Sequence, residues 1–253
     1  MKVGAIIPCR MRASRLPGKP LLDVGGRTAM ERVVARVQAC SRVERVIIAT
    51  TAEPDDDRLC AFAEHCGVDV FRGSTDDVLQ RIARAALTGG LDAVVEVDGD
   101  DLLCAEEYME RGLELVLGSE VDYLSFTGLP LGITPSILRT EALERAMKIK
   151  PPSDTSTGFF RFLQESGQFQ VAKVAANNPA HRHPTARLTL DYPQDLIFFS
   201  EVYRVLDERG GGWDLAGLVA LLHDRPDFVA LNQGLDEAYW QHFETGVTKG
   251  FSA

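Results

Sequence analysis

The sequence Val-Gly-Ala-Ile-Ile-Pro at residues 3–8, followed by Cys-Arg-Met-Arg-Ala-Ser-Arg-Leu-Pro-Gly-Lys-Pro at residues 9–20, decides the fold. The apolar run predicts a buried strand, and two prolines with a glycine then predict a loop over 9–19. Guanidinium and ammonium groups around such a turn favour a polyphosphate ligand. The alternative is a charged loop that only faces solvent. The position of the loop directly after the first strand favours the polyphosphate site over this alternative. The cationic side chains of this loop are Arg10, Arg12, Arg15 and Lys19.

Strands and helices alternate through the first half of the chain. Apolar runs predict strands over 43–50, 68–71 and 92–97. Helical spacing predicts helices over 28–40, capped by Thr28, over 54–66, and over 75–87, capped by Ser74 or Thr75. This alternation predicts an α/β fold with a mainly parallel sheet between two layers of helices. Ligands bind such sheets at the carboxyl ends of strands, which directs attention to 9–19, 72–77 and 98–101.

The second half of the chain is less regular. We expect one domain over residues 1–253, with room for a projecting arm around 128–180. Helices are predicted over 105–117, 141–147, 157–165, 193–209 and 214–223, the last of them capped by Asp214. Strands are predicted over 122–126, 169–174 and 187–190, and a loop with an edge strand over 128–138.

Composition excludes several classes of protein. The net charge of −10 argues against general affinity for nucleic acid or an anionic membrane, because both need a positive field. No apolar run approaches the roughly 18–20 residues that span a bilayer, and the N-terminal apolar stretch is too short for a secretory signal, so we expect a cytoplasmic protein. Five cysteines without a CxxC pair argue against a disulfide scaffold and a cysteine zinc site.

Two acidic segments follow predicted strands. Asp98-Gly99-Asp100-Asp101 ends the strand over 92–97, and a buried strand that opens into acids favours a hard cation such as Mg²⁺. Asp191 ends the strand over 187–190 and would supply a second carboxylate. The alternatives are an ordinary acidic turn for the first segment and a helix cap for Asp191.

Other motifs narrow the choice of chemistry. The chain lacks GxxxxGK[ST] and GxGxxG, which excludes two large classes of phosphate-binding loop. It also lacks a GxSxG elbow, which argues against serine hydrolase chemistry. In the stretch Phe71–Arg81, Gly73 permits close backbone approach to a ligand, and Arg81 could reach back toward an anion. His181 and His183 are interpreted as surface residues.

These segments together resemble the sugar-acid cytidylyltransferases. The loop Arg10–Leu21 is similar to the signature of that family. Phe71-Arg72-Gly73-Ser74 with Asp77-Val78-Leu79, and Leu190-Asp191-Tyr192-Pro193 with Asp195-Leu196, resemble its spore coat polysaccharide biosynthesis branch. The 3-deoxy-manno-octulosonate and acylneuraminate enzymes are related.

The resemblance implies a nucleotide-diphospho-sugar transferase fold, which is Rossmann-like with a mixed, mainly parallel sheet, and a homodimer. It implies Mg²⁺-dependent transfer of CMP from CTP to a sugar acid or related acidic acceptor, with release of pyrophosphate. Arg15, Lys19 and Asp100 would be catalytic, and Asp100 and Asp191 would bind the metal. The implied nucleotide-binding residues are Pro8, Arg10, Ser14, Arg15, Lys19, Arg72, Gly73, Ser74, Asp77 and Asp98.

The sequence departs from the family most strongly in its middle. Asp98 stands where the octulosonate enzymes carry glutamine, and the stretches 128–138 and 153–161 replace their acceptor elements. The acceptor therefore stays open, with Arg161 or Arg139 as candidate anchors for its acidic group. The alternatives are another nucleoside triphosphate as donor, a glycosyltransferase that uses Asp98-Gly99-Asp100 as a DxD motif, and a non-catalytic nucleotide-binding scaffold.

Overall fold

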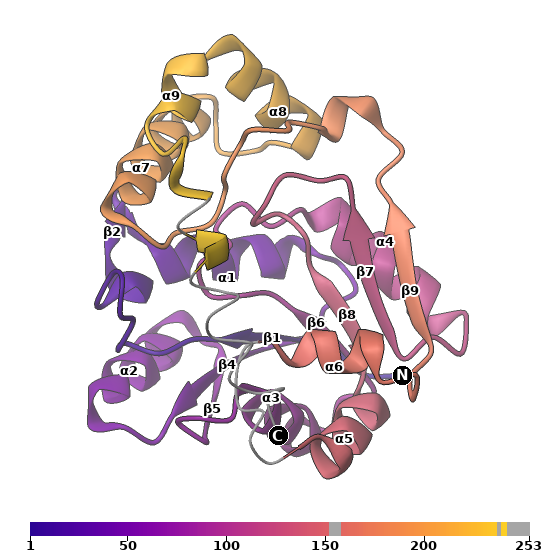
Figure 1. The fold of residues 1–253 in the computed structure, drawn as a ribbon. Helices are drawn as coiled ribbons and strands as arrows, with labels where there is room; N and C mark the ends of the chain where they lie inside the picture. Colours follow the sequence, from indigo (N-terminus) through magenta and orange to yellow (C-terminus); the bar gives the residue numbers. More distant parts are fainter. Residues whose placement is uncertain (152–157, 237–238, 242–253) are drawn as a thin grey trace.

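The computed structural model describes residues 1–151, 158–236 and 239–241, and its main sheet has seven strands in the order β5-β4-β1-β6-β8-β7-β9 (Figure 1). Strand β8 is antiparallel to β6 and β7, and the other neighbouring pairs are parallel. The sheet is therefore mixed and mainly parallel. The strands are β1 (Val3–Pro8), β4 (Arg45–Thr51), β5 (Asp69–Gly73), β6 (Ala93–Glu96), β7 (Tyr123–Thr127), β8 (Ser136–Arg139) and β9 (Val171–Ala175). A separate small ribbon pairs β2 (Asp23–Val24) with β3 (Arg27–Thr28).

Helices cover both faces of the sheet (Figure 1). One apolar layer is formed with α3 (Val78–Gly89), α5 (Thr140–Ile149) and α6 (Phe159–Glu165). The opposite layer is formed with α1 (Ala29–Ala39), α2 (Asp57–Cys66), α4 (Glu106–Leu117), α7 (Pro193–Glu208), α8 (Leu215–Asp224) and α9 (Pro226–Ala230). Short 3-10 turns occur at η1 (Lys19–Leu21), η2 (Pro54–Asp56) and η3 (Pro179–His181). The three-layer α/β architecture predicted from the alternation of elements is confirmed.

Side-chain caps explain several helix starts. Thr28 accepts a hydrogen bond from the backbone N–H of Glu31, and the Glu31 carboxylate accepts from the N–H of Thr28, so α1 begins with a full capping box. Asp214 caps α8 as predicted. Helix α3 begins later than predicted, because Asp77 rather than Ser74 or Thr75 accepts the N–H of Gln80.

Two strand predictions differ from the structure. The strand predicted within 128–138 is not an edge strand, because β8 lies between β6 and β7. No regular strand forms over 187–190, where Arg187 makes one isolated bridge with Leu131. The N–H groups of Leu188 and Leu190 donate instead to the carbonyls of Leu131 and Asp100, so this segment is held in extended form by two different loops.

The chain reverses its direction of travel across the sheet between β1 and β6. Strands β1, β4 and β5 follow one another outward, and β6 then returns to the other side of β1. The two loops that leave β1 and β6 are therefore neighbours, and the N–H of Gly99 donates to the carbonyl of Pro8. Such a reversal opens a ligand-binding crevice at the carboxyl ends of the two strands.

The segment 128–180 contributes to the main sheet where it is described. Strand β8 pairs with β6, and β9 pairs with β7. Phe159 and Phe162 of α6 belong to the apolar layer shared with α3 and α5. Within the described part of the chain, no helix combines the length and the hydropathy needed to cross a membrane.

Candidate active site

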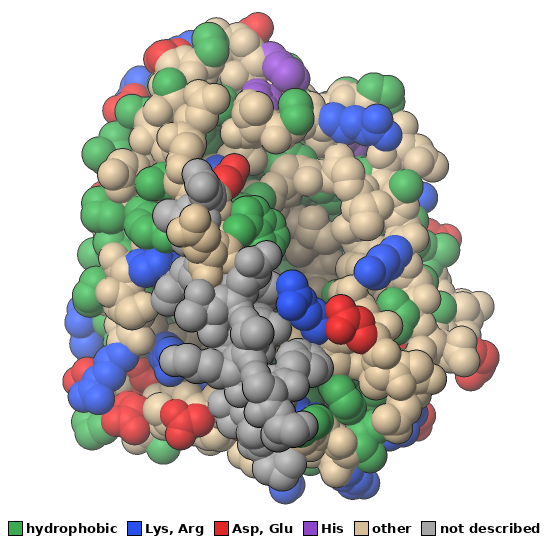
Figure 2. Space-filling view, viewed as in Figure 1, with side chains coloured by type: hydrophobic (Ala, Val, Ile, Leu, Met, Phe, Trp, Pro, Cys, Tyr) green, Lys and Arg blue, Asp and Glu red, His purple; other side chains and the backbone are tan. Residues whose placement is uncertain are grey.

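A cleft of about 1250 Å³ opens at the carboxyl ends of β1 and β6. Figure 2 shows a hollow on this face of the molecule, between the part formed by α7, α8 and α9 and the part formed by β7 and β9. The cleft is lined by the loop after β1, the turn after β6, residues 129–132, part of α6, and Tyr239 with Trp240. Most of the predicted cationic loop and both predicted acidic segments therefore face one space.

The loop after β1 is anchored by Met11. The Met11 side chain is buried in the core, and its N–H donates to the Asp56 carboxylate over 2.7 Å. Its carbonyl accepts hydrogen bonds from the N–H groups of Ala13 and Gly18. Gly18 has a φ of 73°, a left-handed conformation that glycine adopts without strain, and it leads into η1 at Lys19. The loop is thus fixed at both ends, so Lys19 returns to the sheet edge.

The loop cations separate into two groups. Arg10, Arg15 and Lys19 line the cleft, as do Pro8 and Ser14. Arg12 is exposed and pairs with Asp55 at 2.8 Å and Glu53 at 3.6 Å, away from the residues that line the cleft. Charge and position along the chain do not distinguish Arg12 from the other three, whereas the family resemblance leaves Arg12 out of the implied nucleotide-binding residues.

Two of these cations contact the predicted metal ligands. Lys19 hydrogen-bonds to Asp100, and its Nζ also lies 3.3 Å from Asp191 Oδ1. Arg15 hydrogen-bonds to the same oxygen of Asp191. Burial would lower the pKa of Lys19, but Asp100 and Asp191 raise it above its ordinary value, so the ammonium stays charged. The structure therefore brings Arg15, Lys19, Asp100 and Asp191 together.

Asp191 pairs with cationic side chains and does not cap a helix. The carboxylate that accepts the N–H groups of Asp191 and Tyr192 at the start of α7 belongs to Asp195. Arg187 donates to Asp191 over 2.8 Å and to Asp195 over 3.2 Å, and its side chain is 1% exposed. Burial raises the pKa of Asp191, but the charges of Lys19, Arg15 and Arg187 outweigh it and lower the pKa below its ordinary value. Asp191 is thus held as a carboxylate.

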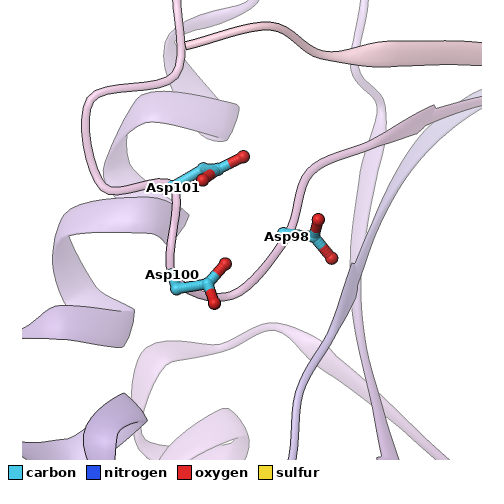
Figure 3. A group of neighbouring side chains, drawn as sticks. All are labelled: Asp98, Asp100 and Asp101. Atoms are coloured by element: carbon cyan, nitrogen blue, oxygen red, sulfur yellow. The ribbon is translucent and has the colours of Figure 1, made fainter. Parts of the chain in front are cut away.

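Three acids crowd the turn after β6, as Figure 3 shows. Asp98, Asp100 and Asp101 each offer a carboxylate oxygen, and these oxygens lie within 4.8 Å of one another. Asp98 lines the cleft with an exposed side chain, and the protein around the cleft partly desolvates its carboxylate. This desolvation and the charge of Asp100 raise the pKa of Asp98 to about 7. Burial, followed by Asp100 and Asp98, raises the pKa of Asp101 well above its ordinary value.

The crowded acids suit a divalent cation. Among ion pairs of the described residues, none involves Asp98 or Asp101, so positive charge from the chain reaches this turn mainly through Lys19. Hard carboxylate oxygens at this spacing are the donors that Mg²⁺ prefers. A cation would relieve the repulsion that raises both pKa values. Glu96, which is buried at the end of β6, has its pKa raised well above its ordinary value by burial and then by Asp98.

Gly99 lets the acidic turn pack against the loop after β1. A Cβ atom at this position would lie 2.7 Å from the Cβ of Cys9 and 3.3 Å from the Pro8 carbonyl oxygen. A larger residue would push the two loops apart. The glycine between Asp98 and Asp100 is therefore required by a tertiary contact, not by a positive φ.

The segment 72–77 is next to the cleft, but the four residues of it that the resemblance implies to bind nucleotide do not line the cleft: Arg72, Gly73, Ser74 and Asp77. Arg72 donates to the carbonyls of Thr51 and Glu53, both over 3.0 Å. A Cβ on Gly73 would meet the Phe71 ring at 2.8 Å, so this glycine serves packing within β5.

The other two residues organise the start of α3. Ser74 accepts the N–H of Asp77, and Asp77 caps the helix and pairs with Lys150 at 2.9 Å. Their neighbours Asp76, Val78 and Arg81 line the cleft instead. The Arg81 guanidinium, expected to reach an anion, donates to the carbonyls of Ala49 and Ser74.

Of the two candidate anchors for the acceptor, Arg139 and Arg161, only Arg161 lines the cleft. Arg139 donates to the carbonyls of Val116, Val121 and Ser119, which fixes its guanidinium beside α4. Arg161 on α6 lines the cleft together with Phe160, Gln164 and Thr134. Of the two histidines interpreted as surface residues, His183 is 9% exposed and stacks on His223 at 4.4 Å between ring centroids.

Some residues of the site carried no clear signal in the sequence. Arg187 precedes Asp191 by four residues. In the strand predicted over 187–190 this spacing does not indicate an ion pair, so the contact between the two side chains was not expected. Tyr239 and Trp240 lie far along the chain and reach the cleft through tertiary packing.

Comparisons with known proteins show the family to which the chain is similar. A family model described as cytidylyltransferase matches residues 4–202. The spore coat polysaccharide biosynthesis protein SpsF of Bacillus subtilis is 26% identical over 238 residues, which covers 88% of this chain and 94% of that protein.

Solved structures share the fold. A cytidylyltransferase from Leptospira borgpetersenii superposes with a TM-score of 0.81 at 25% identity, covering 90% of this chain and 97% of that one. A CMP:2-keto-3-deoxy-manno-octonic acid synthetase in complex with CTP superposes with a TM-score of 0.59 at 18% identity, covering 83% of this chain and all of that one.

Proposed function

The chain belongs to the cytidylyltransferase family, and from this membership we propose that it transfers CMP from CTP to a hydroxyl group of a sugar acid or related acidic acceptor, with Mg²⁺ as cofactor. It is a nucleotidyltransferase enzyme. One observation carries the finer proposal: Arg15 and Lys19 of the loop after β1 contact Asp191 and Asp100 in the lining of one cleft. Cations for a triphosphate and carboxylates for a metal therefore share one space.

The triphosphate is assigned to the loop after β1. Arg10, Ser14, Arg15 and Lys19 line the cleft on this side. Guanidinium and ammonium groups bind phosphate oxygens through strong, charge-assisted hydrogen bonds. The solved synthetase of the same fold binds CTP, which supports CTP as the donor. We place the nucleoside near Pro8, Arg10 and Asp98, on the side where Asp76 and Val78 also line the cleft.

The metal is assigned to Asp100 and Asp191, which share Lys19 as a hydrogen-bond donor. Asp98 and Asp101 add negative charge beside them. When bound, a Mg²⁺ ion supplies charge stabilisation at the phosphates and lowers the pKa of a hydroxyl group bound to it. With a nucleotide bound, Lys19 and Arg15 would exchange their carboxylate partners for phosphate oxygens.

The acceptor hydroxyl attacks the α-phosphorus in line with the leaving group. One P–O bond forms to the acceptor, the bond between the α-phosphorus and the bridging oxygen breaks, and pyrophosphate leaves with the electron pair. The hydroxyl proton passes to solvent, so no protein base is obligatory. Lys19 and Arg15 stabilise the negative charge that develops on the leaving pyrophosphate.

The acceptor is assigned to the side of the cleft formed by α6 and residues 129–134. Arg161 provides a cation for an acidic group, and Gln164 and Thr134 provide hydrogen-bonding groups. Phe160 offers an apolar ring surface on the same side. These groups suit an acidic carbohydrate. Arg139 is not assigned this role, because backbone carbonyls hold its guanidinium.

The family resemblance also leads us to propose a homodimer in the cytoplasm. Light scattering after size exclusion is expected to give twice the chain mass of 27.8 kDa. A mass of 27.8 kDa at micromolar concentration would contradict the dimer and leave the assigned chemistry unaffected.

Thermal unfolding with nucleotides tests the proposed function without knowledge of the acceptor. Unfolding would be measured with CTP, GTP, ATP and UTP, each with and without Mg²⁺. A ligand at 100 times its dissociation constant adds about 2.7 kcal/mol, which raises the midpoint by about 5 °C or more in a chain of this size. We expect a Mg²⁺-dependent shift with CTP. A shift with another triphosphate alone would change the donor, and the absence of any shift would refute the proposed function.

A further inference from the structure

We propose that Tyr239 is a positioning residue of the triphosphate site, acting through Arg15. This inference rests on the proposed function of the cleft. Tyr239 lies outside residues 4–202, the segment that matches the family model. Two aromatic rings contact Arg15: its Cζ atom lies 5.4 Å from the centroid of Tyr192 and 5.5 Å from that of Tyr239. The same two rings lie 5.6 Å and 4.7 Å from the Cζ atom of Arg187.

The segment that carries Tyr239 is attached to the site by polar contacts. Asn232 is 1% exposed, and its side-chain amide donates to the Arg187 carbonyl over 3.0 Å and to Asp195 over 2.9 Å. Asp236 accepts from the Arg187 guanidinium over 3.4 Å. Residues that follow α9 thus bind the same arginine that holds Asp191, which places Tyr239 at the cleft wall.

The two arginines beside Tyr239 have different freedom. Arg187 is fully buried and is held by Asp191, Asp195 and Asp236. Arg15 is 24% exposed and is held by Asp191 and the two rings. If Asp191 were to hold a metal ion, the rings of Tyr192 and Tyr239 would still contact the Arg15 guanidinium and hold it beside the cleft.

Ring contacts of this kind have a definite physical effect. The face of a tyrosine ring attracts a guanidinium, and the attraction grows where water is partly excluded. The contact also restricts a long side chain to few conformations before the ligand arrives, which reduces the entropy lost on binding. Tyr239 therefore favours binding of the β- and γ-phosphates, and it leaves binding of the nucleoside and the α-phosphate unchanged.

The test compares a triphosphate with its monophosphate. Affinities for CTP and CMP would be measured by calorimetry with Mg²⁺ for the full chain and for Tyr239→Leu, Tyr239→Phe and Gln233→Ala. Gln233 is an exposed residue of the same segment and serves as the matched control. We expect Tyr239→Leu to weaken CTP binding about tenfold and to leave CMP binding unchanged. Tyr239→Phe keeps the ring, and its affinity for CTP is expected to stay within twofold of the wild-type value.

Each other outcome has a definite meaning. Equal weakening of CTP and CMP, or failure of Tyr239→Phe to restore CTP binding, would overturn the role of the ring. If Tyr239→Leu does not fold, Tyr192→Leu removes the other ring and carries the same expectation.

The wild-type chain separates this inference from the proposed function. A wild-type chain that binds a different nucleoside triphosphate would change the proposed donor, and that nucleotide and its monophosphate would replace CTP and CMP in the comparison. A wild-type chain that binds no nucleoside triphosphate would overturn both proposals.

Discussion

The Nζ atom of Lys19 lies 3.3 Å from Oδ1 of Asp191, although 172 residues separate the two along the chain. Lys19 ends the loop that leaves β1, and Asp191 ends an extended segment before α7. Asp100, from the turn after β6, hydrogen-bonds to the same ammonium. The acids of two distant segments are thus joined through one cation, the Lys19 ammonium.

Asp100→Asn is expected to reduce turnover by a factor of about 100 or more without unfolding the protein, because the amide removes one negative oxygen from the proposed metal site. Pyrophosphate release and the unfolding midpoint would be measured on the same sample. Asp227→Asn changes an exposed acid paired with Arg225 and is the control. Activity near the wild-type level in folded Asp100→Asn would refute the metal assignment.

Lys19→Met is expected to reduce turnover by a factor of about 100 to 1000, because the charge on the leaving pyrophosphate loses its ammonium partner. The ligand-free protein should also lose roughly 1–3 kcal/mol of stability, since Asp100 is left without its cation. Steady-state kinetics and urea unfolding measure the two effects. Lys148→Met removes an exposed ammonium paired with Glu144 and should change neither.

Arg161→Gln is expected to raise the KM for the acceptor about tenfold and to leave the KM for CTP unchanged, because Arg161 lies on the acceptor side of the cleft. Initial rates with each substrate varied in turn, using the sugar acid that supports pyrophosphate release, give both constants. Arg84→Gln, at an exposed position of α3, is the control. An effect on CTP alone would place Arg161 in the nucleotide site.

Asp56→Asn is expected to destabilise the protein at pH 7 by roughly 1–3 kcal/mol, because the carboxylate accepts hydrogen bonds from the N–H groups of Met11 and Thr51. Burial opposes the charge, but these hydrogen bonds lower the pKa of Asp56 below its ordinary value of 3.8. The contribution of the Asp56 charge to stability is therefore present above pH 3.8, and it is lost as the pH falls through the lower pKa that Asp56 has in the folded protein.

Urea unfolding of wild type and Asp56→Asn between pH 3 and pH 7 measures this contribution. The gap between the two proteins should narrow as the pH falls below 3.8. Asp55→Asn changes the neighbouring exposed acid and is the control. It should cost little stability. A gap that stays constant with pH would show that the Asp56 charge is not the source of the effect.

Gly99→Ala is expected to cost roughly 1–3 kcal/mol and to lower activity, because the new Cβ would lie 2.7 Å from that of Cys9. The two loops of the cleft would have to separate. Gly212→Ala is the matched control, since a Cβ there meets nothing within 4 Å. Equal stability of the two variants would show that the loops accommodate the added atom.

Local patterns predicted the elements well. The predicted helix over 28–40 is observed as Ala29–Ala39 with its Thr28 cap, because apolar spacing and capping act over a few residues. The predicted cap of the next helix, Ser74 or Thr75, is wrong, because the observed cap is Asp77. All three side chains are chemically able to cap a helix, and only the backbone path selects one of them. The interior position of β8 was also missed, because strand order depends on pairing partners far along the chain.

The sequence by itself determined the α/β layers, the cationic loop after β1 and the acidic turn after β6, because these follow from periodicity, proline, glycine and charge over short distances. Tertiary structure alone decided which charges meet. It turned Arg12 and Arg139 away, fixed Arg72 to backbone carbonyls, and gave Asp195 the helix start so that Asp191 faces Lys19. It also brought Tyr239 to Arg15. Contacts across so many residues depend on how the whole chain packs, which no local pattern encodes.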